Sequence, residues 1–382
     1  MKTENQQRIA LSTYFFLSGF CFSTWASRIP NIKMAFDLNE AELGNLLMVM
    51  PVSSLIGLPV SGWLVSRFES RYPLIVSFVL LSVSLSLIGI ADNLFLLITG
   101  IFCFAFAMRI FNIAMNTQSL TLQKTFKRKI IGSFHGLWST GGLLGVAFST
   151  LLIKFDIPIY QHLPAVSVFT LILAFIAFKF LLKKDRSTQG NKLRFGKPDK
   201  PTMYLGFIVF LAAITEGGMF DWSGVYFKEV VKEDIFTLGY LIFMVFMALS
   251  RFFSDRIMES IGMEKNYIIS AGLVCFGVLL MIIFPYFWTA FIGFCLVGIG
   301  VAAVIPMTFI LAGSSEKYSP GMAISIITTY AIVGMLLGPP LVGYLAHLFN
   351  LKVSFILFFI SALMLIPISQ LFFKNQKENV QK

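Results

Sequence analysis

Charge is scarce in this chain of 382 residues. Only 13% of the residues are charged, whereas 57% are hydrophobic and the mean hydropathy is +0.81. A soluble globular protein carries about twice that share of charge. Cysteine is scarcer still: the four cysteines all lie inside apolar runs, without disulfide or metal-ligand spacing. We interpret them as small buried hydrophobic residues in a polytopic membrane protein.

Long loops and catalytic motifs are also lacking. No loop is large enough for a soluble catalytic domain, and the chain has no phosphate-binding glycine loop, zinc-ligand cluster or nucleophile elbow. These absences exclude an ATP-driven pump and predict neither an enzyme nor a cofactor or metal site. The net charge of +11 does not indicate nucleic acid, because basic residues of membrane proteins gather in cytoplasmic loops.

The apolar residues form twelve runs, each long enough to cross about 30 Å of hydrocarbon. The first run follows a polar N-terminus and has no small-residue cleavage site, so we expect a retained helix. The runs predict an all-α membrane protein with 12 transmembrane helices in two six-helix bundles. They cover residues 9–30, 41–65, 74–92, 95–120, 131–153, 163–182, 203–227, 236–254, 266–285, 287–312, 321–346 and 352–373.

A polar, basic stretch separates the two sets of six runs. The predicted organisation is an N-terminal bundle over residues 1–182, a cytoplasmic linker over 183–202, and a C-terminal bundle with a short tail over 203–382. When loops are assigned alternately to the two sides, most Lys and Arg residues fall on the side of the termini and the linker. This asymmetry predicts that both termini are cytoplasmic.

The two halves resemble one another, as in many transporters built from repeats with a solute site between them. Three short segments match in the same order in both halves. The pairs are Phe22–Ser27 with Met219–Gly224, Gly62–Arg67 with Arg251–Arg256, and Gly141–Gly145 with Gly334–Gly338. The halves are therefore expected to be pseudo-symmetric.

With these features the chain resembles the major facilitator superfamily over nearly its whole length. The signature of that family between helices 2 and 3 fits at Gly62, Arg67 and Arg71, whereas Ser66 and Glu69 replace its aspartate and second glycine. The C-terminal copy of the signature has Asp255, Arg256 and Gly262.

The resemblance implies alternating access, in which two bundles rock about a central site lined by helices 1, 4, 7 and 10. It assigns gating to Gly62, Arg67, Arg71, Asp255 and Arg256. These charges would then form ion pairs in only one of the two conformations. The alternative is that they are ordinary basic and acidic residues at cytoplasmic helix ends.

Arg28, Arg109, Glu216 and Asp221 are the charged residues inside apolar runs that bear on function. Left unpaired, they would together cost on the order of 10 kcal/mol, so each must pair, become neutral or face water. Glu216, near mid-helix, is the prime candidate for proton coupling. Burial favours the protonated form of a carboxyl group, whereas a nearby arginine favours the ionised form, so a change of conformation can switch its protonation. The alternative is a permanent salt bridge to Arg109 or Arg28. Asp221 is a second coupling candidate, or shapes the outer vestibule.

Other polar and aromatic residues on these helices suit a hydroxylated solute. Arg109, Asn112 and Asn116 follow the i, i+3, i+7 spacing of one helical face, and their donors suit hydroxyls or carboxylates. Trp25 and Trp222 are equivalent in the two halves and are candidates for stacking on a sugar ring, or else for anchoring at the membrane interface. We assign solute binding to these residues and Arg28.

His135 is a candidate proton relay because histidine titrates near neutral pH. It lies about one turn from the cytoplasmic end of its run, where an interfacial hydrogen-bonding role is equally compatible with the sequence.

The sequence thus predicts a secondary transporter in the bacterial inner membrane, which takes up a small polar solute such as a sugar or sugar acid with protons. It is expected to act as a monomer in the lipid bilayer. Two alternatives stay open. One is proton-driven efflux of amphipathic or cationic compounds, and the other is a non-transporting receptor or scaffold.

Overall fold

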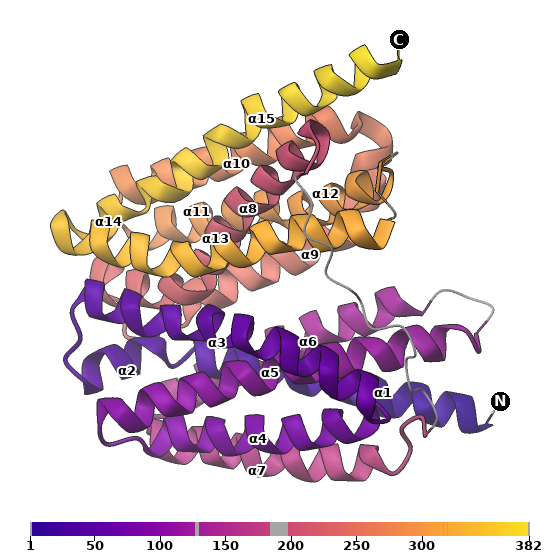
Figure 1. The fold of residues 1–382 in the computed structure, drawn as a ribbon. Helices are drawn as coiled ribbons and strands as arrows, with labels where there is room; N and C mark the ends of the chain where they lie inside the picture. The colour runs from indigo at the N-terminus through magenta and orange to yellow at the C-terminus, as the bar shows by residue number, and fades with distance from the viewer. Residues whose placement is uncertain (1, 127–129, 184–197, 316, 319, 381–382) are drawn as a thin grey trace. The chain divides into compact units, whose positions relative to one another are not determined.

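The computed structural model describes residues 2–126, 130–183, 198–315, 317–318 and 320–380 and has no β-strand among them. Figure 1 shows the helices in chain order. Those before the linker are α1 (Lys2–Ala26), α2 (Ile29–Ala35), α3 (Glu40–Arg67), α4 (Arg71–Ile90), α5 (Leu94–Gln123), α6 (Ile131–Lys154) and α7 (Ile159–Phe178). Those after it are α8 (Lys200–Tyr226), η1 (Phe227–Val231), α9 (Leu238–Ile261), α10 (Met263–Ile283), α11 (Phe287–Ala302), α12 (Val304–Gly313), α13 (Pro320–Leu348), α14 (Leu351–Ser354) and α15 (Ile356–Val380).

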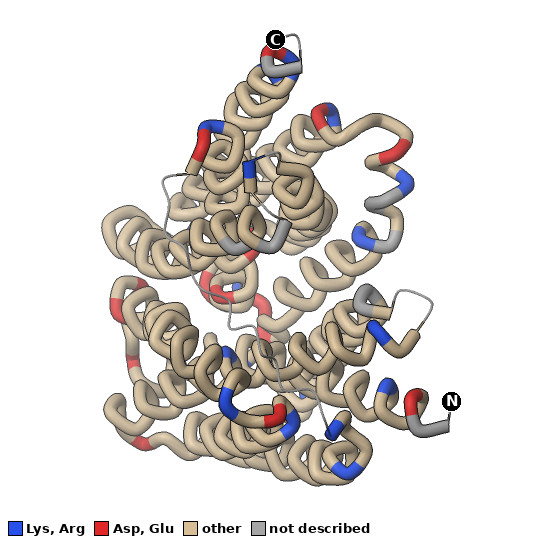
Figure 2. Tube along the Cα trace, turned by 45° about the vertical axis from the view of Figure 1, so that its right-hand side comes forward, with Lys and Arg blue, Asp and Glu red and all other residues tan. Residues whose placement is uncertain are grey.

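The twelve predicted runs all correspond to helices or helix pairs. Among the described residues, eleven helical segments are long and apolar enough to span a membrane. The exception is α9, whose apolar part is the shorter stretch 238–251. Its remaining turns carry the exposed residues Arg256 and Glu259. Charged residues otherwise concentrate at the helix ends and in the loops (Figure 2).

Three predicted spans are interrupted. The first, 9–30, divides into α1 and α2 at Ser27 and Arg28. The predicted span 287–312 divides into α11 and α12 at Ala303. Pro306 explains the break, because it has no N–H to donate to the carbonyl of Ala302, four residues earlier. The last span is likewise divided into α14 and α15 at Phe355.

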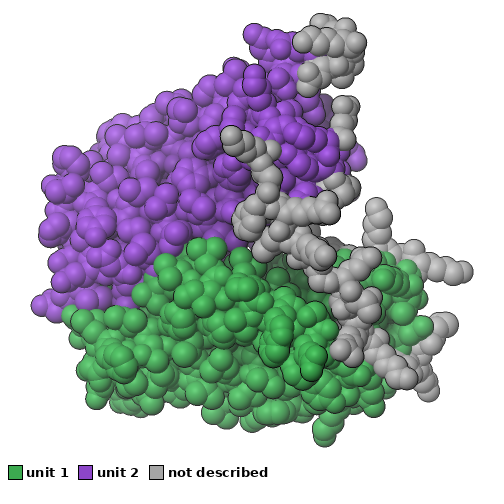
Figure 3. Space-filling model, in the orientation of Figure 1, with its two compact units in different colours: residues 1–36, 49–194 green, residues 37–48, 195–382 purple. Residues whose placement is uncertain are grey.

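The chain forms two compact units (Figure 3). Unit 1 comprises residues 1–36 and 49–194, and unit 2 comprises residues 37–48 and 195–382. Helix α3 therefore begins in unit 2 and continues in unit 1. The predicted linker lies largely outside the described residues, since 184–197 are not described, and its last residues form the first turn of α8.

The two units repeat one packing scheme. In unit 1, α1 packs on α6 and α7, and α4 packs on α5 and α7. In unit 2, α8 packs on α13 and α15, and α10 packs on α11 and α15. The packing partners of α1 and α4 in unit 1 thus correspond to those of α8 and α10 in unit 2, six spans later.

Glycines set the closest helix contacts in both units. On α6, a Cβ atom added to Gly145 would lie 2.6 Å from the carbonyl oxygen of Phe20 on α1. On α13, a Cβ atom added to Gly334 would lie 3.2 Å from Cβ of Ala213 on α8. The matched glycine segments therefore occupy the same place in each unit, where they allow the helix backbones to approach closely.

Candidate functional site

Glu216 lies on α8 within unit 2 and is 8% exposed. One carboxylate oxygen, Oε1, accepts a hydrogen bond from Nη2 of Arg251 at 2.9 Å. The second oxygen is buried and has no hydrogen-bond partner among the described residues. The charge of Glu216 is therefore balanced within unit 2, by an arginine on the neighbouring helix α9.

Arg251 connects three helices of unit 2. Its Nε donates a hydrogen bond of 3.4 Å to the carbonyl of Ala302, at the break between α11 and α12. This is the carbonyl that Pro306 leaves without an intrahelical donor. One guanidinium thus satisfies both a membrane carboxylate and the free carbonyl of a broken helix.

Asp221 is in a different environment from Glu216. Five helical steps separate the two residues, so their side chains point about 140° apart around α8. Asp221 shares a partly exposed face of α8 with Phe207, Phe210 and Gly217. It forms no hydrogen bond or ion pair with any described residue. Its carboxyl group therefore differs from that of Glu216, whose charge is balanced by Arg251.

Arg109 lies on α5 in unit 1 and is partly exposed. Its Nε is buried without a hydrogen-bond partner, and its guanidinium forms no ion pair with a described residue. Its stem packs against α3: a Cβ atom added to Gly57 would lie 3.1 Å from Cβ of Arg109. A membrane-embedded cation is thus held in place by packing but has no counter-ion in the part of the chain that is described.

The predicted polar stripe on α5 is present. Arg109, Asn112 and Asn116 are all partly exposed, whereas Ile110, Phe111, Ala114 and Met115 are buried. Nδ2 of Asn116 donates to the carbonyl of Asn112 at 2.8 Å, which leaves Oδ1 of Asn116 as an acceptor.

The sequence profile of the Major Facilitator Superfamily matches residues 11–315 and 242–382. The chain belongs to this family. It is 30% identical over 353 residues to an uncharacterized MFS-type transporter of Yersinia pestis, covering 91% of each protein. It is also 30% identical to membrane protein MosC of Rhizobium meliloti, over 96% of this chain and 90% of that protein. The protein is therefore a multi-pass membrane transporter of the superfamily.

Solved structures confirm the family fold. A mutant of the nucleoside transporter NupG superposes with a TM-score of 0.79 at 12% identity, covering 97% of this chain and all of that one. A bacterial homologue of the lysosomal transporter Spinster, in an inward-facing and occupied conformation, gives 0.76 at 14% identity and covers 96% of both chains. At these identities the likeness concerns the fold alone.

Within this superfamily fold, Arg28 is used inside its own unit. It is 2% exposed and lies between α1 and α2. Its Nε donates to Nδ1 of His162 at 2.9 Å, its Nη2 to the carbonyl of Ile157 at 2.7 Å, and its Nη1 to Oδ1 of Asn31 at 3.2 Å. These acceptors are neutral groups of unit 1, so Arg28 joins α1 to the start of α7. Its predicted contact with a solute stays a prediction.

Both candidate stacking residues are buried. Trp25 is 1% exposed and Trp222 is 0% exposed. The ring of Trp25 packs on Phe104, with 6.3 Å between centroids. Neither indole face is accessible to a solute in this structure, so the stacking proposed from the sequence requires a conformation in which an indole is uncovered.

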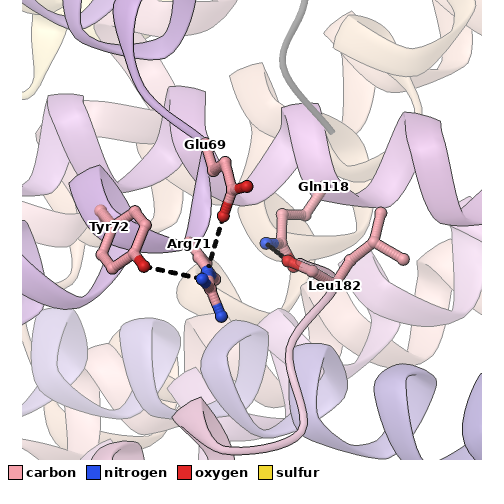
Figure 4. A network of polar contacts seen from close by, with 5 residues as sticks. All are labelled: Glu69, Arg71, Tyr72, Gln118 and Leu182. Atoms are coloured by element: carbon pink, nitrogen blue, oxygen red, sulfur yellow. Dashed lines mark hydrogen bonds and ion pairs between the residues drawn. The ribbon is translucent and has the colours of Figure 1, made fainter. Parts of the chain in front are cut away.

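The gating residues of the family signature differ in their contacts. Nε of Arg71 lies 2.9 Å from Oε2 of Glu69, and its Nη2 donates to the hydroxyl of Tyr72 at 2.7 Å (Figure 4). Nearby, Gln118 of α5 donates to the carbonyl of Leu182 at 3.2 Å, which holds the end of unit 1 (Figure 4). Glu69, which replaces a signature glycine, thus provides Arg71 with a local partner.

The remaining gating candidates are exposed, except Asp255, whose side chain the structure does not describe. Gly62, Arg67 and Arg256 are exposed, and nothing would contact a Cβ atom at Gly62. The side chain of Asp255 lies outside the described residues. State-dependent pairing of these residues therefore stays a prediction.

His135 is exposed on the first turns of α6, where its ring meets Phe15 edge-on at 5.5 Å. No group of three or more His, Cys, Asp or Glu residues in the described chain is arranged to hold a metal ion. The relay role of His135 likewise stays a prediction.

Sequence reasoning missed Arg251 and His162. Arg251 was aligned with the signature at the helix end, although it lies inside the predicted apolar run 236–254. Pro306 was an available sign: because proline has no N–H, the carbonyl of Ala302 needs a hydrogen-bond donor from elsewhere in the fold. His162 had no comparable sign, because its partner is 134 residues away.

Proposed function

We propose that this protein is a secondary active transporter that couples uptake of a small polar solute to proton movement, with Asp221 as the coupling carboxyl group. The observation that carries the proposal is the carboxyl group of Asp221, which lies on the partly exposed face of α8 and forms no hydrogen bond or ion pair with any described residue. A carboxyl group in a membrane helix without a counter-ion requires a proton, a cation or water.

Glu216 is the weaker candidate for coupling. Its charge is balanced by Arg251 at 2.9 Å, and that arginine also holds the break between α11 and α12. Protonation of Glu216 would leave the guanidinium without its counter-ion and would disturb three helices. We therefore assign a positioning role to Glu216 and the proton to Asp221, on the accessible side of the same helix.

Efflux of cationic compounds is the second candidate. Asp221 would attract a cation, and a multidrug resistance protein of Bacillus subtilis is 21% identical over 97% of this chain. Arg109 opposes this reading, because an unpaired guanidinium on a partly exposed membrane face repels cations. Uptake of a polar solute accommodates both residues.

The test is proton movement in proteoliposomes that contain an internal pH dye. Wild type, Asp221→Asn and Glu216→Gln are compared over a panel of sugars, sugar acids and cationic dyes. Asp92→Asn is the matched control, since Asp92 lies in the exposed turn between α4 and α5. We expect Asp221→Asn to abolish solute-driven proton movement and to preserve exchange of the solute across the membrane.

Two results would contradict the proposal. If Asp221→Asn moves protons at the wild-type rate, Asp221 is not the coupling group. If wild type carries a solute without any pH change, transport is not proton-coupled. Proton movement driven only by cationic dyes, in the opposite direction, favours efflux instead.

A further inference from the structure

We infer that the transported solute is a small hydroxylated carboxylate, and that its carboxylate binds Arg109. This inference rests on the proposed function and names the solute class for it. Arg28 donates to three neutral groups and Arg251 balances Glu216. Arg109 alone of these three arginines forms neither a hydrogen bond nor an ion pair with a described residue.

An isolated guanidinium in a membrane helix is energetically costly. A structural arginine at that depth would be expected to have a partner within the fold, as Arg28 and Arg251 do. A bound anion satisfies Arg109 only while the solute is present. A carboxylate fits best, because guanidinium and carboxylate match as two parallel hydrogen bonds.

The surroundings of Arg109 hold its stem and leave its end accessible. Gly57 on α3 lies against Arg109: a Cβ atom added to it would lie 3.1 Å from Cβ and 3.3 Å from Cγ of Arg109, so these atoms would have to shift by a few tenths of an ångström. Four residues before it, Ser53 donates to the carbonyl of Phe102 on α5 at 2.6 Å and fixes α3 against α5. The guanidinium is thus positioned by its neighbours without being neutralised by them.

The same face of α5 provides neutral polar groups next to the charge. Asn112 and Asn116 follow Arg109 by three and seven residues, which is about 4.5 and 10.5 Å along the helix. The Asn112 side-chain amide has no partner among the described residues, and Oδ1 of Asn116 is available as an acceptor. One guanidinium followed by two amides suits a carboxylate at one end of a chain or ring of hydroxyl groups.

The inference is tested by binding to the full-length protein in lipid nanodiscs, measured by isothermal titration calorimetry. The probes are matched pairs that differ in the carboxylate: D-galacturonate and D-galactose, D-glucuronate and D-glucose, D-gluconate and D-glucitol. We expect binding by one or more acids and none by its neutral partner. Arg109→Gln should weaken that binding about 10- to 100-fold, as expected for loss of a charged hydrogen-bonding group.

Two further variants separate recognition from folding. Lys124→Gln is the matched control, because Lys124 is an exposed cation at the end of the same helix, and it should bind as wild type does. Gly57→Ala retains the arginine but displaces its stem, so it should weaken acid binding while the melting temperature shows that the protein is folded.

Three results would overturn the inference. The first is equal binding of an acid and its neutral partner, and the second is acid binding that Arg109→Gln leaves unchanged. The third is no binding by any acid of the panel. Its failure is distinguishable from failure of the proposed function. Acid binding through Arg109 without proton movement rejects coupling alone, whereas proton movement driven by a neutral sugar through Asp221 rejects the carboxylate class alone.

Discussion

Glu216 and Asp221 show how two carboxylates on one helix acquire different roles from their neighbours. Both lie in the apolar span of α8, and insertion of either one is costly. An arginine from α9 reaches Glu216, whereas no described residue reaches Asp221. The difference arises because the two side chains point about 140° apart around the helix. Glu216 is directed toward the packed neighbour α9, and Asp221 toward the partly exposed face.

A double-mutant cycle tests the Glu216–Arg251 pair. Arg251→Gln should lower the free energy of unfolding by about 3 kcal/mol, because it leaves the Glu216 carboxylate buried without a counter-ion. The double variant with Glu216→Gln should regain much of that loss, since the uncompensated charge is gone. The measurement is denaturant-induced unfolding in detergent micelles.

Arg256→Gln provides the control for this cycle, because Arg256 is exposed on the same helix. It should change the free energy of unfolding by less than about 0.5 kcal/mol. If the effects of the two substitutions at 216 and 251 simply add, the ion pair does not stabilise unit 2.

At the scale of elements, glycine-lined contacts hold each unit together. The segment Gly141–Gly145 on α6 packs against α1, and Gly334–Gly338 on α13 packs against α8. Backbone-to-backbone approach of this kind replaces the hydrophobic driving force that is absent between helices in lipid. The contacts within α1–α6 and α8–α13 therefore depend on small residues at a few positions.

Gly145→Ala is expected to destabilise unit 1 by about 1–3 kcal/mol, because the new methyl group must displace α1. It would otherwise lie 2.6 Å from the carbonyl oxygen of Phe20. The control is Gly136→Ala on the same helix, where no atom lies within 4 Å of the added Cβ. Thermal unfolding in detergent measures both, and equal melting temperatures would refute the packing role of Gly145.

At the scale of the whole molecule, the orientation in the membrane is a prediction from the basic residues of the loops. Fusions of alkaline phosphatase and of green fluorescent protein test it, because the first is active only outside the cytoplasm and the second fluoresces only inside. We expect a fluorescent C-terminal fusion at Lys382 and active phosphatase after Asp92, between α4 and α5.

The internal control is a fusion to a loop on the predicted cytoplasmic side, such as the turn at Glu69 between α3 and α4. It should behave as the C-terminal fusion does. Active phosphatase at Lys382 would reverse the topology. It would also place the signature residues on the outer side, where the family resemblance does not expect them.

The sequence by itself determined the membrane class, the helical spans and the repeat, because these follow from apolar run length and from short segments of local pattern. It also placed the charged residues within those spans. Only the tertiary structure decided which charges are balanced. The pairing of Arg251 with Glu216 and of Arg28 with His162 joins residues 35 and 134 positions apart, and the helix packing that brings them together leaves no local trace. The buried state of Trp25 and Trp222, and the free groups of Arg109 and Asp221, have the same origin: each depends on which neighbouring helix covers that face.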